Sequence, residues 1–182
     1  GSHMVVGSSD QRRFYTANIG SDSVTAFALQ NVPPAGSSIT QIAVGKQPEA
    51  IDLSPDGKEV WVGLNNDGGV DVIDTATNKV VKRIDLGGRP YRVRFTRDGK
   101  FAVHPTWPAN ELIIVDAATK SITKRVKMEG QPFGIDFSND GTYAFVTALK
   151  PDKVYKVNLT TGTVEGSVET GNQPDGVAIF GF

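Results

Sequence analysis

Cationic, aromatic and imidazole side chains gather in one short stretch of the sequence, at Arg89, Tyr91, Arg92, His104 and Trp107. Guanidinium groups hold carboxylates or phosphates, and flat aromatic rings stack on flat or sugar-like ligands. These residue types therefore predict a pocket for an anionic or aromatic ligand. A plainer alternative is that Trp107 packs across a loop stiffened by prolines, and that the arginines are solvated or paired.

The sequence offers little for catalysis. His104 is the only histidine apart from His3, so one chain cannot supply a metal site with two histidines. A lone histidine acting as a general base also needs a nucleophile or substrate within hydrogen-bond reach, and no Gly-x-Ser-x-Gly elbow accompanies it. The acidic residues lack the register of a calcium-binding loop, and the glycines form neither a phosphate loop nor a dinucleotide fingerprint. We expect no catalytic residue, no metal and no cofactor.

A sequence repeat positions these side chains. Prolines recur at Pro48, Pro90, Pro132 and Pro174, and the intervals 90−48, 132−90 and 174−132 are each 42 residues. The turn sequence SPDG returns in phase as TRDG and SNDG. A fixed period of roughly 40 to 45 residues, with several short strands in each unit, is typical of β-propeller blades.

The repeat predicts an all-β β-propeller with four four-stranded blades of about 42 residues. We read residues 1–4 as the remnant of an affinity tag and residues 5–182 as the propeller domain. Blade one comprises 13–44 together with 174–180, blade two 48–86, blade three 90–128 and blade four 132–170. Pairing the two ends of the chain would complete blade one and remove exposed sheet edges. The alternatives are half of an eight-bladed propeller or a fragment, which we favour as the origin of the chain, or a homodimer that completes an eight-bladed ring.

Function is expected where one blade differs from the others, and blade three differs most. Arg92 stands at a position where the other repeats carry small residues, namely Ala50, Gly134 and Gly176. His104 stands where two other repeats carry valine. The loop before strand one and the loop after strand two of a blade lie on the same rim, so these departures predict a site on the rim of blade three.

Arg94 has a different explanation. Its equivalents in the neighbouring repeats are Asp52 and Asp136. An arginine between two aspartates predicts ion pairs that join neighbouring blades and fix their order.

The composition limits the classes of partner. The formal net charge is −1, from 19 basic and 20 acidic residues, which gives no electrostatic footprint for nucleic acid or an anionic membrane. The apolar runs are too short for a membrane span. The absence of cysteine excludes disulfides and thiolate metal sites but leaves the cellular compartment open.

The units P-x-x-I-x-L-S-P-D-G-K and V-x-V-I-D-T-A-T-N-K-V-V resemble YVTN-type β-propeller repeats, and Tyr15-Thr16-Ala17-Asn18 resembles the motif that names them. The resemblance implies a propeller over about residues 14 to 182. It also implies an extracytoplasmic setting, in the periplasm, at the cell surface or in a surface layer. It implies no fixed active site.

Three classes of function are open. The first, which we favour, is a non-enzymatic module that binds a protein or a small molecule. The second is the scaffold of a lactonase-like or quinoprotein-like enzyme, which the resemblance allows. The third is a structural module of a surface layer.

Overall fold

The structure is a computed structural model that describes residues 1–29 and 37–180. Residues 30–36, which fall inside the range expected for blade one, and residues 181–182 lie outside the described part. The described residues form strands and one short 3-10 helix, η1 (Ile19–Ser21). The strands are β1 (Ser2–Gly7), β2 (Arg13–Asn18), β3 (Ser23–Ala28), β4 (Ser38–Ala43), β5 (Pro48–Leu53), β6 (Glu59–Leu64), β7 (Gly69–Asp74), β8 (Lys79–Asp85), β9 (Arg89–Pro90), β10 (Arg94–Phe95), β11 (Phe101–Trp107), β12 (Glu111–Asp116), β13 (Ser121–Lys127), β14 (Gln131–Phe137), β15 (Tyr143–Leu149), β16 (Lys153–Asn158) and β17 (Thr163–Glu169).

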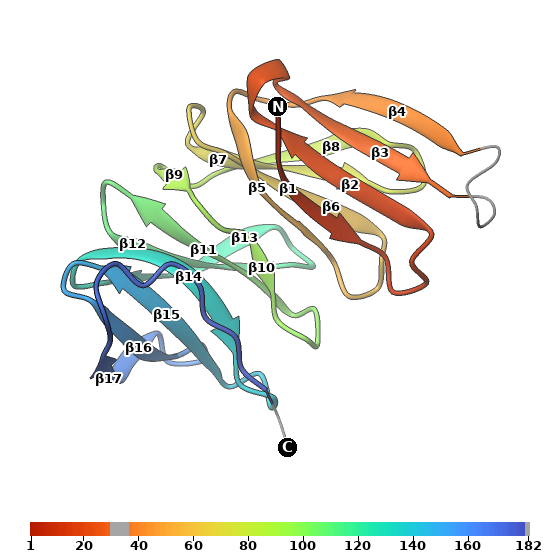
Figure 1. Cartoon of the computed structure of the whole chain (residues 1–182). Helices are drawn as coiled ribbons and strands as arrows, with labels where there is room; N and C mark the ends of the chain where they lie inside the picture. The colour runs from red at the N-terminus through yellow and green to blue at the C-terminus, as the bar shows by residue number, and fades with distance from the viewer. Residues whose placement is uncertain (30–36, 181–182) are drawn as a thin grey trace. The chain divides into compact units, whose positions relative to one another are not determined.

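The strands build four antiparallel sheets in chain order, β1-β2-β3-β4, β5-β6-β7-β8, β10-β11-β12-β13 and β14-β15-β16-β17 (Figure 1). In the third sheet the first strand is interrupted, and its pieces β9 and β10 both pair with β11. The pairing of β5 with β6 and of β14 with β15 shifts register at the corresponding place. These four sheets confirm the expected all-β fold. Their number is that of the blades in half of an eight-bladed propeller.

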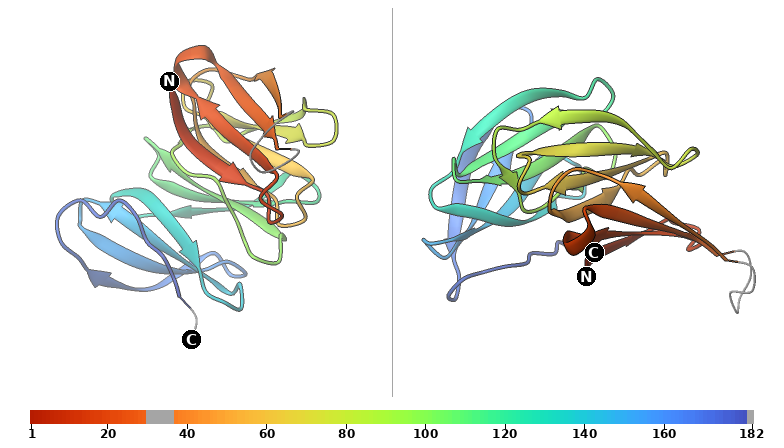
Figure 2. Two further views of the ribbon diagram at one scale, coloured as in Figure 1. Left: turned by 45° about the vertical axis from the view of Figure 1, so that its right-hand side comes forward. Right: turned by 90° about the horizontal axis from the view of Figure 1, so that it is seen from above.

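The chain divides into two compact units, Gly1–Arg89 and Pro90–Phe182, and each unit contains two sheets (Figure 2). In the first unit, one face of the first sheet packs on the second sheet around residues such as Tyr15 and Ile51. In the second unit, the third sheet packs on the fourth around residues such as Leu112 and Phe137. Alternate residues of strands such as β2, β6 and β15 supply these cores, in line with the period of two in a strand.

One hydrogen-bonded turn links the first two strands of every sheet. In the second sheet, the Ser54 hydroxyl donates to Asp56 at 2.7 Å and accepts from the backbone N–H of Glu59 at 2.9 Å. Gly57 follows with φ +70°, a conformation that a residue without a Cβ adopts at little cost. The corresponding hydroxyl bond lowers the pKa of each turn aspartate, in Asp140 to about 2. The prediction that the repeated SPDG-type sequence forms the turn between the first two strands is therefore confirmed.

The predicted completion of blade one by residues 174–180 is wrong. β1 occupies the first-strand position of the first sheet, with Val5 opposite Thr16, and residues 174–180 form no strand. The sequence holds a signal for this arrangement in the turn after β1, because Ser8 donates to Asp10 and accepts from the backbone N–H of Arg13. The residues expected to be a tag remnant therefore contribute to a strand.

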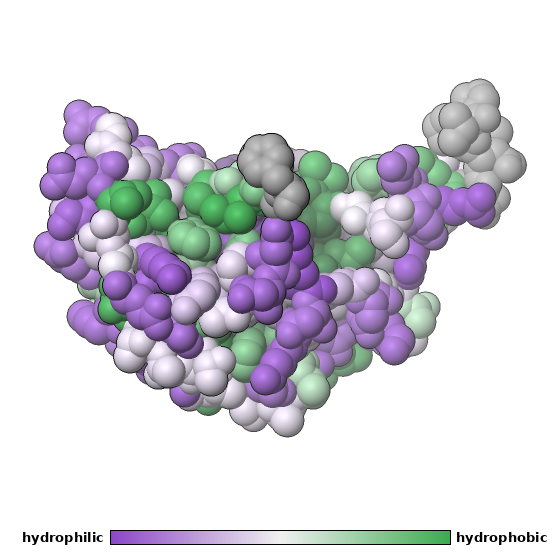
Figure 3. Space-filling model, turned by 90° about the horizontal axis from the view of Figure 1, so that it is seen from below, coloured by the Kyte–Doolittle hydropathy of each residue, from purple (hydrophilic) through white to green (hydrophobic). Residues whose placement is uncertain are grey.

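The surface mixes apolar and polar residues. On the face drawn in Figure 3, green apolar patches are interrupted by hydrophilic side chains. Among the described residues there is no helix long and apolar enough to cross a membrane.

Candidate functional site

Three aromatic rings and one arginine meet in the second unit, and we call Tyr91, Arg92, Trp107, Phe133 and Asp175 the aromatic–arginine cluster. The ring centroids of Tyr91 and Trp107 lie 4.2 Å apart, and each lies 5.7 Å from that of Phe133. The guanidinium carbon of Arg92 lies 4.3 Å from the centroid of the Phe133 ring. Cation–π and ring contacts at these distances are each worth about 0.5–1 kcal/mol or more.

The interrupted strand positions this cluster. Tyr91 and Arg92 lie in the break between β9 and β10, so their side chains do not follow the alternation of a regular strand. Trp107 ends β11, and its indole N–H donates to the backbone carbonyl of Pro132 at 2.9 Å. Phe133 follows that proline in β14. Two neighbouring sheets of one unit therefore supply the three rings.

Arg92 is held on three sides. Its guanidinium donates to the Asp175 carboxylate at 2.8 Å and to the Tyr91 backbone carbonyl at 2.9 Å, and it stacks on Phe133. The Arg92 side chain is 19% exposed, whereas that of Asp175 is 70% exposed. The structure thus brings together Tyr91, Arg92 and Trp107 as predicted. It also shows the pairing of the arginine that the plainer alternative proposed.

His104 and Arg89, the other two predicted ligand residues, lie elsewhere. His104 is fully buried in β11 opposite Ile113, and so offers no surface to a ligand. Burial lowers the pKa of His104 to about 3, and a hydrogen bond to the backbone of Arg92 acts in the opposite direction. Arg89 is exposed in β9 and ends the first unit.

One of the predicted ion pairs is present. Arg94 of β10 lies 3.4 Å from the Asp136 carboxylate of β14, which joins the third and fourth sheets. Asp52 lies in β5 of the first unit, where its carboxylate accepts from the backbone N–H of Leu53. A pairing of Asp52 with Arg94 stays a prediction.

Sequence reasoning missed Phe133 and Asp175. Tyr91, Phe133 and Asp175 occupy the same position of successive repeats. Arg92 occupies the next position, so its partners come from the following two repeats. Comparing Arg92 with the residues at the preceding position of the following two repeats would have found both Phe133 and Asp175.

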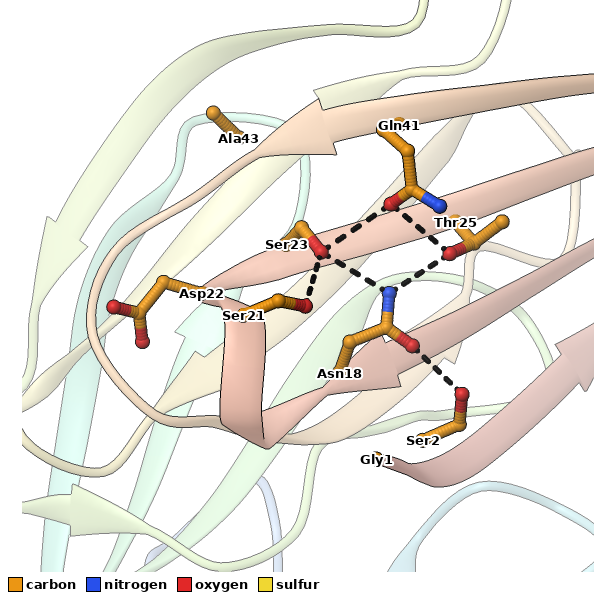
Figure 4. A pocket seen from close by; sticks show the side chains of 9 residues that line it. All are labelled: Gly1, Ser2, Asn18, Ser21, Asp22, Ser23, Thr25, Gln41 and Ala43. Carbon is orange, nitrogen blue, oxygen red and sulfur yellow. Dashed lines mark hydrogen bonds between the residues drawn. The ribbon is translucent and has the colours of Figure 1, made fainter.

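A second candidate site is a polar pocket of about 670 Å³ in the first unit. Figure 4 shows its hydroxyl and amide side chains pointing toward one another from β2, β3 and β4. Asn18 donates to Thr25 at 2.8 Å, and Thr25 donates to Gln41 at 3.2 Å. Gly1 and Ser2 also line the pocket, so part of its wall is made by the residues expected to be a tag remnant.

The polar pocket was not predicted, because its residues belong to no sequence motif. Asn18 occupies a position that is apolar in the second sheet, where Leu64 packs in the core. Such a polar residue at an apolar repeat position is the signal that could have found the pocket. In the described residues there is no group of three or more histidine, cysteine or acidic residues that could hold a metal ion.

A family model for the cytochrome D1 heme domain matches residues 3–140, which is most of the chain. The chain belongs to the cytochrome D1 heme domain family. No curated protein matches the chain.

Among the described residues, His104, Met128 and Tyr155 are poorly placed to hold the haem that the name of the cytochrome D1 heme domain family implies. Haem iron is held by histidine, cysteine, methionine or tyrosine side chains that reach the macrocycle. His104 and Met128 are buried in the protein interior, and the sequence has no cysteine. Burial and a hydrogen bond to Glu129 raise the pKa of Tyr155 to about 12, which disfavours a phenolate ligand.

Solved structures share the propeller fold of this family member. The chain is similar to hydrazine synthase of Kuenenia stuttgartiensis (21% identity, 92% of this chain and 48% of that chain, TM-score 0.81). It is also similar to a functionally unknown protein from Desulfotomaculum acetoxidans DSM 771 (16%, 98% and 59%, 0.85). A third is the periplasmic gluconolactonase of Pseudomonas aeruginosa (21%, 92% and 53%, 0.74). The chain therefore spans about half the length of these proteins.

Proposed function

We propose that the chain is part of a non-enzymatic binding module, and that the aromatic–arginine cluster binds a ligand with an anionic group and a ring. The observation that carries the proposal is the state of Arg92. Its guanidinium is fixed against the Phe133 ring, while its counter-ion Asp175 is mostly exposed. A preorganised cation with an accessible partner is suited to exchanging one carboxylate for another.

The chemistry of binding follows from the contacts of Arg92. A carboxylate of the ligand would replace that of Asp175 on the guanidinium, while the hydrogen bond to the Tyr91 carbonyl stays in place. The half-buried rings of Tyr91 and Trp107 would offer their apolar faces to a sugar ring. The ligand class is therefore a sugar acid or a similar ring-bearing carboxylate.

The acid–base groups at the same cluster are poorly placed for catalysis, because the Asp175 carboxylate is paired with Arg92. The cluster contains a guanidinium, three rings and a carboxylate, whereas His104 is buried and its lowered pKa keeps it neutral. A neutral imidazole enclosed in a sheet cannot reach a substrate proton. These features support binding rather than turnover.

An extracytoplasmic, periplasmic setting is part of the proposal. The resemblance of the repeats to YVTN-type propellers implies such a setting, and the similar gluconolactonase of Pseudomonas aeruginosa is described as periplasmic. Fusing the natural gene to a reporter that is active only outside the cytoplasm would test this part. An inactive reporter would contradict it.

Titration calorimetry with glucuronate, and with glucose as the uncharged counterpart, tests the binding proposal. We expect glucuronate to bind and glucose to bind at least tenfold more weakly, because a charged hydrogen bond contributes about 1.5–3 kcal/mol. Arg92→Ala, which introduces the residue found in the second repeat, should weaken glucuronate binding at least tenfold.

Arg125→Ala is the matched control, since Arg125 lies in the same unit and pairs with Glu111. It should leave glucuronate binding unchanged. Equal affinity of the wild type and Arg92→Ala for glucuronate would contradict the proposed site.

A second candidate function is that of a lactonase-like scaffold, which the polar pocket and the similarity to a gluconolactonase favour. A pocket of hydroxyl and amide groups suits a polyhydroxylated lactone. This candidate predicts hydrolysis of gluconolactone that Asn18→Leu abolishes and Arg92→Ala leaves intact. A hydrolysis rate equal to that of buffer alone would reject it.

A further inference from the structure

Residues 174–180, which we call the tail, carry the pattern of a first strand. Pro174 is the fourth of the evenly spaced prolines. Beyond it, Val177 and Ile179 are half-buried, while Ala178 and Phe180 are exposed. This alternation is that of a strand with one covered and one open face.

The tail lies on the fourth sheet in the place that a further first strand would take. The backbone carbonyl of Asp175 accepts from Thr147 of β15 at 3.0 Å, and the backbone N–H of Ile179 donates to Asp136 of β14 at 2.7 Å. In Figure 1 the dark blue segment after β17 runs along β14 and β15. Hydrogen bonds from the fourth sheet therefore fix the position of the tail.

These contacts repeat those between the third and fourth sheets. A Cβ on Gly134 would meet the carbonyl of Asp175, and one repeat earlier Arg92 stacks on Phe133. Asp136 contacts the tail near Ala178, and one repeat earlier Arg94 contacts Asp136. Since the contacts recur with the repeat, the tail is set up as strand one of a following sheet, yet in the described structure it pairs with no strand.

In the first sheet, the strand that matches the tail, β1, has an uncovered apolar residue. Val5 of β1 corresponds to Ile51 of β5, because they oppose Thr16 and Val62 at equivalent positions of β2 and β6. Ile51 is 1% exposed because the first sheet covers it, whereas Val5 is 61% exposed. β1 shifts register between Ser2 and Met4, as β5 and β14 do at the corresponding place, but it lacks the repeat proline. β1 thus differs from these equivalents in the missing proline and in the exposure of Val5.

We propose that the tail of one copy pairs with β2 of a second copy in the place of β1, and that two copies associate reciprocally about a two-fold axis. A second copy is the occupant that fits, since it presents a first sheet of the same repeat whose preceding face is open. The tail would bring the repeat proline, and Ile179 at the position where β1 has Gly7. The solved propellers, about twice as long as this chain, contain as many residues as such a pair.

An engineered disulfide tests the register of this pairing. By equivalence with Ile51 and Val62, the proposal places Val177 opposite Thr16 of the second copy. Opposed residues of antiparallel strands have Cα atoms about 4.5–5.5 Å apart, which suits a disulfide. The chain has no cysteine, so Thr16→Cys combined with Val177→Cys supplies the only thiols.

On mild oxidation of the full chain, we expect a covalent dimer on non-reducing electrophoresis, with each thiol consumed. A disulfide closed within one chain, or thiols that stay reduced, would overturn the proposal. Val5→Cys with Thr16→Cys is the matched control, because it cross-links only when β1 keeps its place; the proposal expects little of that product.

The wild-type chain provides a test that does not depend on these variants. Analytical ultracentrifugation at micromolar concentration should give twice the mass of one chain, and Val177→Asp should shift the mass toward that of one chain. A wild-type chain that sediments as a monomer, as it would if only further blades of a longer protein could cover the tail, would also overturn the proposal.

Discussion

Arg92 and His104 occupy repeat positions that small or aliphatic residues hold elsewhere, and each departure has a different structural consequence. Arg92 lies in the break of a strand, where its guanidinium reaches the Phe133 ring and the Asp175 carboxylate. The His104 side chain is fully buried, at a position that Val62 and Val146 occupy in other sheets. Unusual residue types therefore marked both positions, but only the structure shows which of them reaches the surface.

His104 should make the protein sensitive to acid. The pKa of a free histidine is about 6.5, whereas burial lowers that of His104 to about 3. Below pH 6.5 the unfolded chain therefore binds a proton that the folded chain excludes, and stability falls until the pH nears 3. At pH 5 this difference amounts to about 2 kcal/mol of the free energy of unfolding.

His104→Val should remove this acid sensitivity, because valine fills the equivalent positions. Urea unfolding at pH 7.5 and pH 5 should show the variant losing about 2 kcal/mol less than the wild type between the two conditions. His3 is present in both proteins, so its titration cancels from the comparison. An identical loss of stability in both proteins would show that His104 titrates normally.

The link between the first two sheets is a set of carboxylates that bind successive backbone N–H groups. Gly45 donates to Asp71 at 2.9 Å, Lys46 to Asp67 at 2.8 Å and Gln47 to Asp22 at 2.8 Å. Asp71 is 1% exposed and receives two hydrogen bonds from Arg83 of β8, at 2.7 and 2.8 Å. Buried carboxylates need such partners, so Arg83 supports the whole turn.

Arg83→Gln should destabilise the first unit by about 2 kcal/mol, since it leaves a buried carboxylate short of a charged donor. Arg125→Gln is a matched control at the equivalent position of the third sheet, where the partner carboxylate of Glu111 is 23% exposed. It should cost about 0.5 kcal/mol or less. Urea unfolding measures both, and equal costs would contradict the supporting role of Arg83.

At the level of elements, repetition made most of the fold predictable. The spacing of prolines and Asp-Gly turns gave the number of sheets, because these residues set backbone geometry locally. The role of residues 174–180 was not predictable in the same way. The repeat shows that this segment has the pattern of a first strand, but it does not show which sheet the segment joins. The turn at Ser8 and Asp10, which shows that β1 fills this position, departs from the sequence of the other turns.

The candidate site was predictable in part. Tyr91, Arg92 and Trp107 were found as departures from the repeat, whereas Phe133 and Asp175 looked like ordinary members of their own repeats. Their importance comes from the packing of adjacent blades, which one repeat alone does not encode. The polar pocket was missed for the same reason, since its residues come from four strands and the helix η1 and form no motif.

At the level of the whole molecule, the chain has the fold of its family and half the length of similar structures, but its His104, Met128 and Tyr155 are poorly placed to hold a haem. Propellers of one architecture carry different sites, so the site must be judged from its own residues. Here those residues are a stacked arginine and three rings. The central claim is therefore that the aromatic–arginine cluster binds a ring-bearing carboxylate.

The two indole N–H signals in a nitrogen-resolved NMR spectrum test this claim most directly. Trp61 is fully buried and its indole N–H donates to Glu59, while that of Trp107 donates to Pro132 within the cluster. On addition of glucuronate, the Trp107 signal should shift saturably, the Trp61 signal should stay in place, and the shift should be lost in Arg92→Ala. A Trp107 signal that does not respond, or that responds equally in Arg92→Ala, would contradict the account.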